Sequence, residues 1–192
     1  MTQSRYAVHL RRRREGKTDF RSRKQLLYAG KPRLVVRTSL RYASAQVISY
    51  TPQGDIVIAA ANAKQLGPYG WKASCSNTPA AYLTGLLCGM RAKKAGVEES
   101  ILDIGMRDVV KGARIFAILK GFADAGIDIP YGEGIVPEDD RLNGEHIASY
   151  YKSLDDDARK ARFSKYIKEG VDVTSLPDMV PRVKDEIMKK GE

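Results

Sequence analysis

The chain has 192 residues, 43% of them hydrophobic, and a formal net charge of +10 at pH 7. This length is enough for one domain with a substantial core, but no stretch approaches the roughly 18 to 20 apolar residues that a membrane-spanning helix needs. The first ten residues also contain no apolar segment of the kind found in secretory signals.

The cysteines and histidines are few. The chain has two cysteines, Cys75 and Cys88, which are too few for a disulfide framework. Together with the two histidines they form no closely spaced pair of the kind that zinc sites use. We therefore expect a soluble intracellular protein without a metal ion or another cofactor.

The excess of positive charge is confined to the N-terminal fifth of the chain. Residues 1–37 contain twelve basic and two acidic residues, whereas residues 38–192 contain 21 of each. Solubility alone does not require this segregation, and a basic arm on a neutral domain is the usual arrangement for binding a phosphate backbone. A solvated charged surface is the alternative.

The first 30 residues divide into two parts. Residues 1–18 have neither a helical nor a strand period, and four consecutive arginines on a helix would leave no apolar stripe. We expect an arm that is enclosed by its partner or disordered until bound. From Asp19 onward the pattern predicts a short helix with Asp19 as its cap, Gly30 after its end and Pro32 blocking its continuation.

Three strands are predicted next. The segments 33–39, 44–51 and 56–63 are rich in β-branched and small apolar residues, and a turn signal at 52–55 separates the last two. They predict an antiparallel meander. Residues 64–77 contain two glycines and Pro68 and are expected to be irregular.

A long apolar helix should follow, capped by Asn77 or Thr78. Gly85 and Gly89 lie four residues apart on one of its faces, which predicts a close approach to a neighbouring element. Residues 100–108 are predicted to contain a short buried strand.

An amphipathic helix is predicted at 113–127, so the order of elements indicates an α/β fold with a mixed sheet covered by helices. The composition then becomes polar. Segments 145–154, 155–170 and 178–190 predict short helices in an extension that packs on the domain or on a partner.

Catalytic patterns are weak. His146 and Glu145 are adjacent and would not face each other on a helix. The same order of elements opens ribonuclease-H-like nucleases, which need clustered carboxylates to hold two metal ions. Here the first strand carries no acid, Asp55 is expected in a turn, and Asp103 is the only acid within a predicted strand. We therefore expect no enzymatic activity.

Nucleic-acid binding fits the residues better. Lys31, Arg33 and Arg37 continue the basic surface from the arm onto the first strand. Aromatic residues are interspersed with these basic residues and are candidates for stacking on unpaired bases, although a role in the core is the alternative for Phe20, Tyr28, Tyr42 and Trp71. They are Tyr6, Phe20, Tyr28, Tyr42, Tyr69 and Trp71.

A succession of segments resembles a known family. In order, "RRRREGKTDFRSRKQLL", "KPRLVVRTS", "AQVISY", "YGWKASCSNTPAAYLTGLLCGMRA" and "ARIFAILKGFADAGIDIPYGEGIVPEDDRLNGEHI" are similar to the archaeal and eukaryal type of the large-subunit ribosomal protein eighteen family, the universal 5S-rRNA-binding protein. The resemblance covers about residues 9–150. It depends on the succession and not on any single motif.

The resemblance implies a non-catalytic constituent of the large ribosomal subunit in the cytoplasm. Such a protein binds 5S rRNA and helps attach it to 23S rRNA in the central protuberance, beside neighbouring ribosomal proteins. It also implies a three-layer α/β domain of the ribonuclease-H-like type, also called translational machinery component, without its active site. We expect a basic arm and short helix at 1–30, the 5S-rRNA-binding domain at 31–130, and a mostly helical extension at 131–192.

The expected 5S rRNA contacts combine the charge pattern with positions carried over from the resemblance. They are Arg11, Arg12, Arg13, Arg14, Lys17, Thr18, Arg21, Arg23, Lys24, Lys31, Arg33, Arg37, Gln46, Lys64, Tyr69 and Trp71. An RNA-processing hydrolase that uses the same arm to capture its substrate is the main alternative, and a DNA-binding protein is a second.

Overall fold

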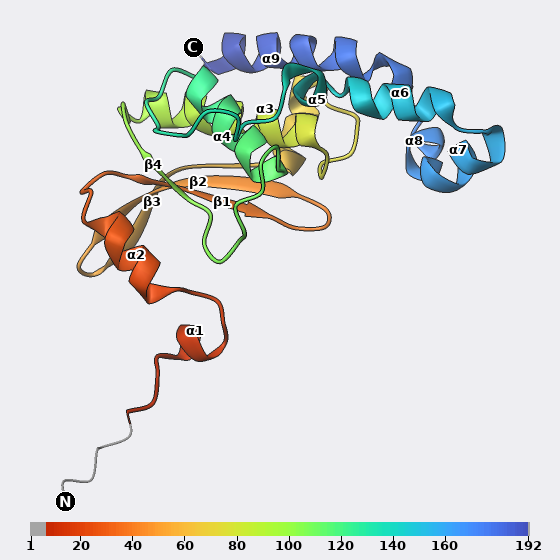
Figure 1. Ribbon diagram of the computed structural model, residues 1–192. Helices are drawn as coiled ribbons and strands as arrows, with labels where there is room; N and C mark the ends of the chain where they lie inside the picture. Colours follow the sequence, from red (N-terminus) through yellow and green to blue (C-terminus); the bar gives the residue numbers. More distant parts are fainter. Residues whose placement is uncertain (1–6, 192) are drawn as a thin grey trace, which may run out of the picture.

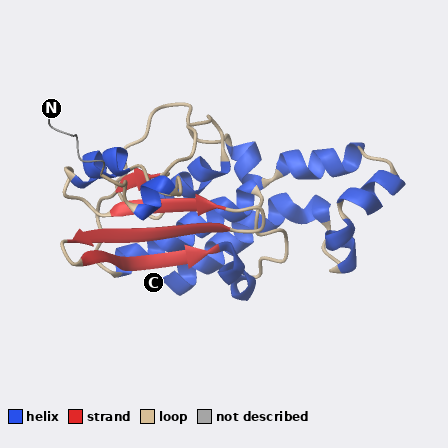
Figure 2. Cartoon of the chain, turned by 90° about the horizontal axis from the view of Figure 1, so that it is seen from below, coloured by secondary structure: helices blue, strands red, loops and turns tan. Residues whose placement is uncertain are grey.

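A computed structural model describes residues 7–191, and its centre is a four-stranded sheet in the order β3-β2-β1-β4. β1 (Arg33–Thr38), β2 (Ala43–Thr51) and β3 (Gly54–Asn62) pair antiparallel, whereas β4 (Ile101–Asp103) pairs parallel with β1. Figure 2 shows the strands side by side. The predicted meander and the mixed α/β sheet are confirmed, and the fourth strand is shorter than the segment in which it was predicted.

Helices cover one face of this sheet. α3 (Thr78–Lys94) and α4 (Arg114–Asp124) lie directly on it, and α9 (Leu176–Gly191) packs on the outer side of α3 (Figure 1). The strand side chains that point toward α3 are aliphatic and fully buried, such as Leu34 opposite Val47. This alternation explains why the other side chains of the same strands face away from the helices.

Glycines let α3 and α4 approach closely. A Cβ atom on Gly85 would lie 2.0 Å from the backbone oxygen of Ile118, and one on Gly89 would lie 2.5 Å from the Cβ of Ala125. The Asn77 side chain begins α3 by accepting a hydrogen bond from the Ala80 amide at 2.9 Å. The predicted cap and the predicted close approach are both confirmed.

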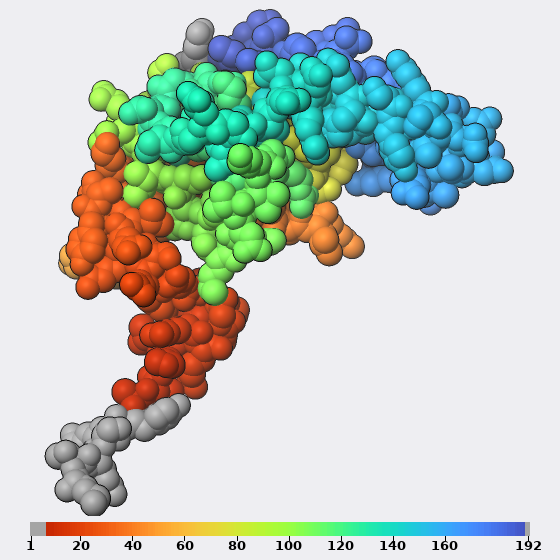
Figure 3. Space-filling view, in the orientation of Figure 1, coloured from red at the N-terminus to blue at the C-terminus, as the bar shows by residue number. Residues whose placement is uncertain are grey.

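The C-terminal part is helical, with α5 (Asp139–Asn143), α6 (Glu145–Ser153), α7 (Asp156–Arg162), α8 (Ser164–Lys168) and the 3-10 turn η2 (Val173–Ser175) before α9. Buried residues of α9 belong to the same hydrophobic core as the sheet, so this helix packs on the domain. α6 to α8 project beyond the end of the sheet (Figures 1 and 3).

Several helical elements differ from the prediction. Residues 155–170 form two helices because Phe163 turns inward between them and packs edge-on against Tyr151, with ring centroids 5.1 Å apart. Residues 63–69, expected to be irregular, form the 3-10 helix η1 (Ala63–Tyr69), whose first turn is closed by reciprocal hydrogen bonds between Asn62 and Gln65. α5 was too short to give a helical period.

The N-terminal arm lies on the opposite side of the sheet from α3 and α4 (Figure 1). It contains α1 (Arg11–Arg14), a single turn that buries none of its residues, and α2 (Phe20–Leu27). The turn at α1 was not predicted, because it has no apolar stripe. Arg5 and Tyr6, which the sequence also counted among the basic and aromatic residues, lie outside the described residues.

The predicted cap and end of α2 are confirmed. Asp19 Oδ1 accepts hydrogen bonds from the amides of Arg21 at 2.9 Å and Ser22 at 3.3 Å. Gly30, with φ +65°, follows the helix. In the part of the chain that the structure describes, no helix is both long and apolar enough to cross a membrane.

Candidate nucleic-acid interface

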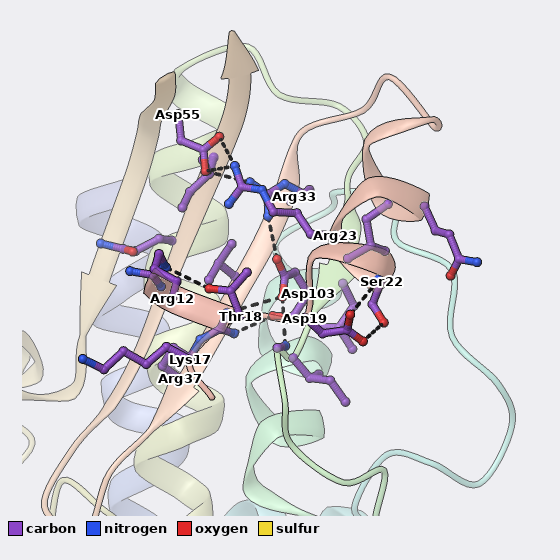
Figure 4. A pocket seen from close by; sticks show the side chains of 18 residues that line it. Arg12, Lys17, Thr18, Asp19, Ser22, Arg23, Arg33, Arg37, Asp55 and Asp103 are labelled. Carbon is purple, nitrogen blue, oxygen red and sulfur yellow. Dashed lines mark hydrogen bonds and ion pairs between the residues drawn. The ribbon is translucent and has the colours of Figure 1, made fainter. Parts of the chain in front are cut away.

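A cavity of about 640 Å³ separates the arm from the open face of the sheet (Figure 4). Its walls come from the arm, from α2, from all four strands and from the loop after β4. Seven of the predicted site residues line it: Arg12, Lys17, Thr18, Arg23, Arg33, Arg37 and Gln46. The fold therefore brings together residues that span 35 positions of the sequence.

The back of the cavity is formed by an ion-pair network centred on Arg33 (Figure 4). Its Nη1 donates to Asp103 Oδ2 at 2.6 Å, and its Nη2 donates to Asp55 Oδ2 at 3.0 Å. Arg23 on α2 donates from Nη2 to both carboxylate oxygens of Asp55, at 2.8 and 2.9 Å. The network therefore ties α2 to three strands of the sheet.

This network corrects two expectations. Arg33 was expected to contact RNA, but it is only 2% exposed and its charge is matched by two carboxylates. Asp55 was expected in a turn, but it belongs to β3, opposite Tyr50. Charge alone pointed to a contact at Arg33 because the sequence does not show that Asp55 and Asp103, which are distant in the chain, bond to it.

Arg37 lies beside the network and is half-exposed. Its Nη1 donates to the backbone oxygens of Val36 at 2.7 Å and Asp103 at 2.9 Å. The guanidinium lies against Gly105, where a Cβ atom would be 2.9 Å from Nη2 and where φ is +67°. Glycine is therefore required at position 105 for two reasons: it adopts the positive φ of the turn, and it leaves room for the Arg37 guanidinium.

The arm presents its cations to solvent. Arg11 to Arg14, Lys17, Arg21 and Lys24 are all exposed. Lys17 pairs with Glu15 at 2.8 Å and Arg11 reaches the same carboxylate at 3.8 Å. Exposed ion pairs of this kind are weak, so both cations can exchange Glu15 for an RNA phosphate. Arg12 is oriented by a hydrogen bond from its Nε to Thr18 Oγ1 at 2.8 Å.

The pKa of Asp19, the cap of α2, is lower than that of an ordinary aspartate. The Ser22 hydroxyl, followed by the amides of Arg21 and Ser22, donates to the Asp19 carboxylate and lowers its pKa. Asp19 therefore stays ionised at neutral pH and continues to cap α2. The cations around it are of the kind that attract an RNA phosphate.

Four predicted site residues lie away from the cavity. Lys31 pairs with Glu99 at 2.5 Å beside the β4 edge. Lys64, Tyr69 and Trp71 lie in and after η1, which packs against α3 and α9, so they do not share the surface of the arm. Lys64 is exposed, and the Nζ of Lys190 lies 5.2 Å from the centre of the Tyr69 ring.

The expectation of base stacking at Trp71 is corrected as well. The indole is 4% exposed and belongs to the hydrophobic core, and its Nε1 donates to the Ser74 backbone oxygen at 3.3 Å. A side chain in that position offers no face to a base. The Tyr28 ring, by contrast, is 75% exposed on the outer end of α2.

Sequence reasoning missed the uncharged floor of the cavity. Val35 and Ile48 share a face of the sheet with Arg33 and Gln46, and the alternation of the strands contained that signal. Leu26, Leu102 and Ile104 complete the apolar lining. The pairing of Asp103 and Asp55 with Arg33 had no local signal, because these residues are 70 and 22 positions away from it.

Little in the described residues favours catalysis. Between residues 7 and 191 no group of three or more His, Cys, Asp and Glu could hold a metal ion. Burial raises the pKa of the Cys88 thiol to about 12 and also raises the pKa of Cys75, so neither is a ready nucleophile at neutral pH. Burial lowers the pKa of His146.

Comparison with known proteins decides the family. A family model described as ribosomal large subunit proteins 60S L5 and 50S L18 matches residues 4–100. Large ribosomal subunit protein uL18 of Methanobrevibacter smithii is 51% identical over 189 residues, which cover 98% of each chain. The chain belongs to this family.

Further relatives agree with this assignment. The uL18 proteins of Methanococcus maripaludis and Thermofilum pendens are each 50% identical over 187 residues, covering 96% of this chain and 97% and 95% of theirs. The similarity that the sequence showed for residues 9–150 therefore extends into the helical extension. The uL18 family consists of ribosomal structural proteins and is not an enzyme family.

Proposed function

We propose that this member of the uL18 family binds 5S rRNA with its arm and helps attach it to 23S rRNA in the central protuberance of the cytoplasmic ribosome, next to other large-subunit proteins. The observation that carries the proposal is the placement of the arm. A cluster of exposed cations stands in front of a cavity on the one sheet face that α3 and α4 leave open. RNA is recognised mainly through its phosphates and its unpaired nucleotides, and both can reach this surface.

The contacts fall into three groups. The exposed arm cations Arg11, Arg12, Arg13, Arg14, Lys17, Arg21 and Lys24 would contact phosphates, together with Arg37 at the cavity. Thr18 and Arg23 would position the arm, since they bond to Arg12 and Asp55. Gln46 faces the cavity, whereas Lys31, Lys64 and Tyr69 lie at other edges and would add separate contacts.

The finer fold assignment is part of the same proposal. Three antiparallel strands followed by a strand parallel to the first, with helices on one face, support a ribonuclease-H-like domain. They also raise the hydrolase alternative, because Asp55 and Asp103 approach the same point. The Arg33 guanidinium bonds to both carboxylates and fills the space between them, which supports an arginine-bridged structural site over a metal-dependent nuclease.

The test uses the full chain with four arm residues, Arg11, Arg12, Arg13 and Arg14, replaced by Gln. The matched control also introduces four Gln residues and so changes the net charge equally. It replaces four exposed basic residues of the projecting helices: Lys160, Arg162, Lys165 and Lys168. Binding to a 5S rRNA transcript should weaken by at least about tenfold in the arm variant and stay nearly unchanged in the control.

Equal losses in both variants would mean that net charge and not the arm determines binding. Incubating the wild-type protein with 5S rRNA and Mg²⁺ tests the alternative, and accumulation of cleaved RNA would favour the hydrolase. Competition with duplex DNA at one fixed salt concentration separates an RNA-binding protein from a DNA-binding protein.

A further inference from the structure

We propose that the cavity between the arm and the sheet receives one unstacked nucleotide of the bound RNA, with its phosphate on the arm side and its base on the sheet side. This inference rests on the proposed function and adds a site to it. The cavity, at about 640 Å³, lies within the range of roughly 300 to 1,000 Å³ that small-molecule sites occupy.

The charge of the lining suits an anion. Five basic and three acidic residues surround the cavity, a net charge of +2. The carboxylates are already engaged: Asp55 and Asp103 by arginines, and Asp19 by the amides that begin α2. Among residues 7–191 no carboxylate lies within ion-pair distance of Arg12, so this cation is available to a phosphate at the mouth.

The floor suits a base. Val35 and Ile48, each 9% exposed, and the half-buried Leu102 form an aliphatic floor beneath a flat ring. Two amide side chains line the same space, Gln46 from the middle of β2 and Gln25 from α2. Gln46 is exposed and its amide makes no hydrogen bond to the residues that the structure describes. An amide both donates and accepts, as the edges of the bases require.

A paired base is not free to enter the cavity. A nucleotide inside a duplex is stacked on both sides and hydrogen-bonded along its edge, so it reaches such a site only by leaving the helix. Unpaired nucleotides of loops and bulges are already free to do so. The cavity would therefore make the protein prefer RNA with unpaired nucleotides, in addition to the attraction that the arm exerts on any phosphate backbone.

The experiment replaces Gln46 by Leu, which keeps the size and the charge and removes the amide. Gln53→Leu is the matched control, because Gln53 is exposed in the turn between β2 and β3 and does not line the cavity. Binding is measured to a 5S rRNA transcript, to a single-stranded RNA of ten nucleotides and to a duplex RNA. Probing of the 5S rRNA with dimethyl sulfate for adenine and cytosine, and with a carbodiimide for uracil and guanine, reports which unpaired bases are covered.

We expect Gln46→Leu to weaken binding of the 5S rRNA and of the single strand by about tenfold, to leave duplex binding unchanged, and to lose protection of one unpaired base. Gln53→Leu should match the wild type throughout. Unchanged single-strand affinity and an unchanged protection pattern in Gln46→Leu would overturn the proposal.

Two further results separate this inference from neighbouring claims. If the wild type bound 5S rRNA no better than the duplex, the proposed function would fail. The affinities of wild type and Gln46→Leu for the single-stranded RNA would still test whether the cavity binds a nucleotide. A free nucleoside monophosphate offers the same chemistry from another source. Displacement of the RNA by micromolar AMP, CMP, GMP or UMP would make the cavity a mononucleotide site and overturn its assignment to RNA.

Discussion

Replacing Arg33 by Met tests how much the buried network stabilises the fold. The methionine fills a similar volume, but it leaves Asp55 and Asp103 without their shared partner. Removing one member of a buried ion pair costs about 3 to 5 kcal/mol, because a charge is left uncompensated. Here the lower end is expected, since Arg37 still contacts Asp103 at 3.4 Å and Arg23 still holds Asp55.

A second term also favours the lower end. The Nε of Arg33 is buried and has no hydrogen-bond partner among the described residues, so the substitution removes an unsatisfied donor as well. We therefore expect Arg33→Met to lower the free energy of unfolding by about 3 kcal/mol. This is a large part of the roughly 5 to 15 kcal/mol that a domain possesses.

The assay is urea unfolding of the full chain, compared with Arg23→Met as the control. Arg23 pairs with the same Asp55, but its side chain is 33% exposed, so its loss should cost only about 1 kcal/mol. The cost at Arg33 should persist in 1 M salt, where exposed pairs are screened. If Arg33→Met cost no more than Arg23→Met, the buried network would not be what holds the back of the cavity together.

Two further substitutions test the packing and the cap. Gly85→Ala should destabilise the protein by about 1 to 3 kcal/mol, because the added Cβ atom would lie 2.0 Å from the backbone oxygen of Ile118. The control is Gly67→Ala in η1, where an added Cβ atom meets nothing within 4 Å and should have little effect. Equal unfolding midpoints for the two variants would contradict the close approach of α3 and α4. Asp19→Ala should lower the helix content of α2, because the amides of Arg21 and Ser22 lose their acceptor. Because the folded pKa of Asp19 is lowered, the wild-type cap stabilises above the unfolded pKa of about 3.9 and is lost as the pH falls through the folded value. The difference between wild type and Asp19→Ala in helix content should therefore vanish in strong acid, and a difference that grew there would contradict the cap.

Much of the fold could be predicted because its signals are local. Asn77 and Asp19 cap helices that begin where their side chains predicted, and Gly85 and Gly89 approach α4 as their spacing indicated. Two of the elements that were missed, α1 and α5, are single turns, and a period of 3.6 residues cannot be detected in four or five positions.

The site was harder to predict because burial on one sheet face depends on partners that are distant in the sequence. The positive charge of Arg33 gave the same sequence signal as that of Arg37, yet one is buried between carboxylates and the other is half-exposed. Trp71 was equally ambiguous, and its burial follows from the packing of η1 on α3. Partners such as Asp103, 70 residues from Arg33, become visible only once the strands are paired.

The salt dependence of 5S rRNA binding tests the central claim most directly. If about six arm cations contact phosphates, log K should fall with log salt concentration with a slope of roughly −4 to −5. Replacing Arg11, Arg12, Arg13 and Arg14 by Gln should make that slope shallower by about 3. A wild-type slope near zero, or one that the four substitutions leave unchanged, would contradict an arm that binds the RNA backbone.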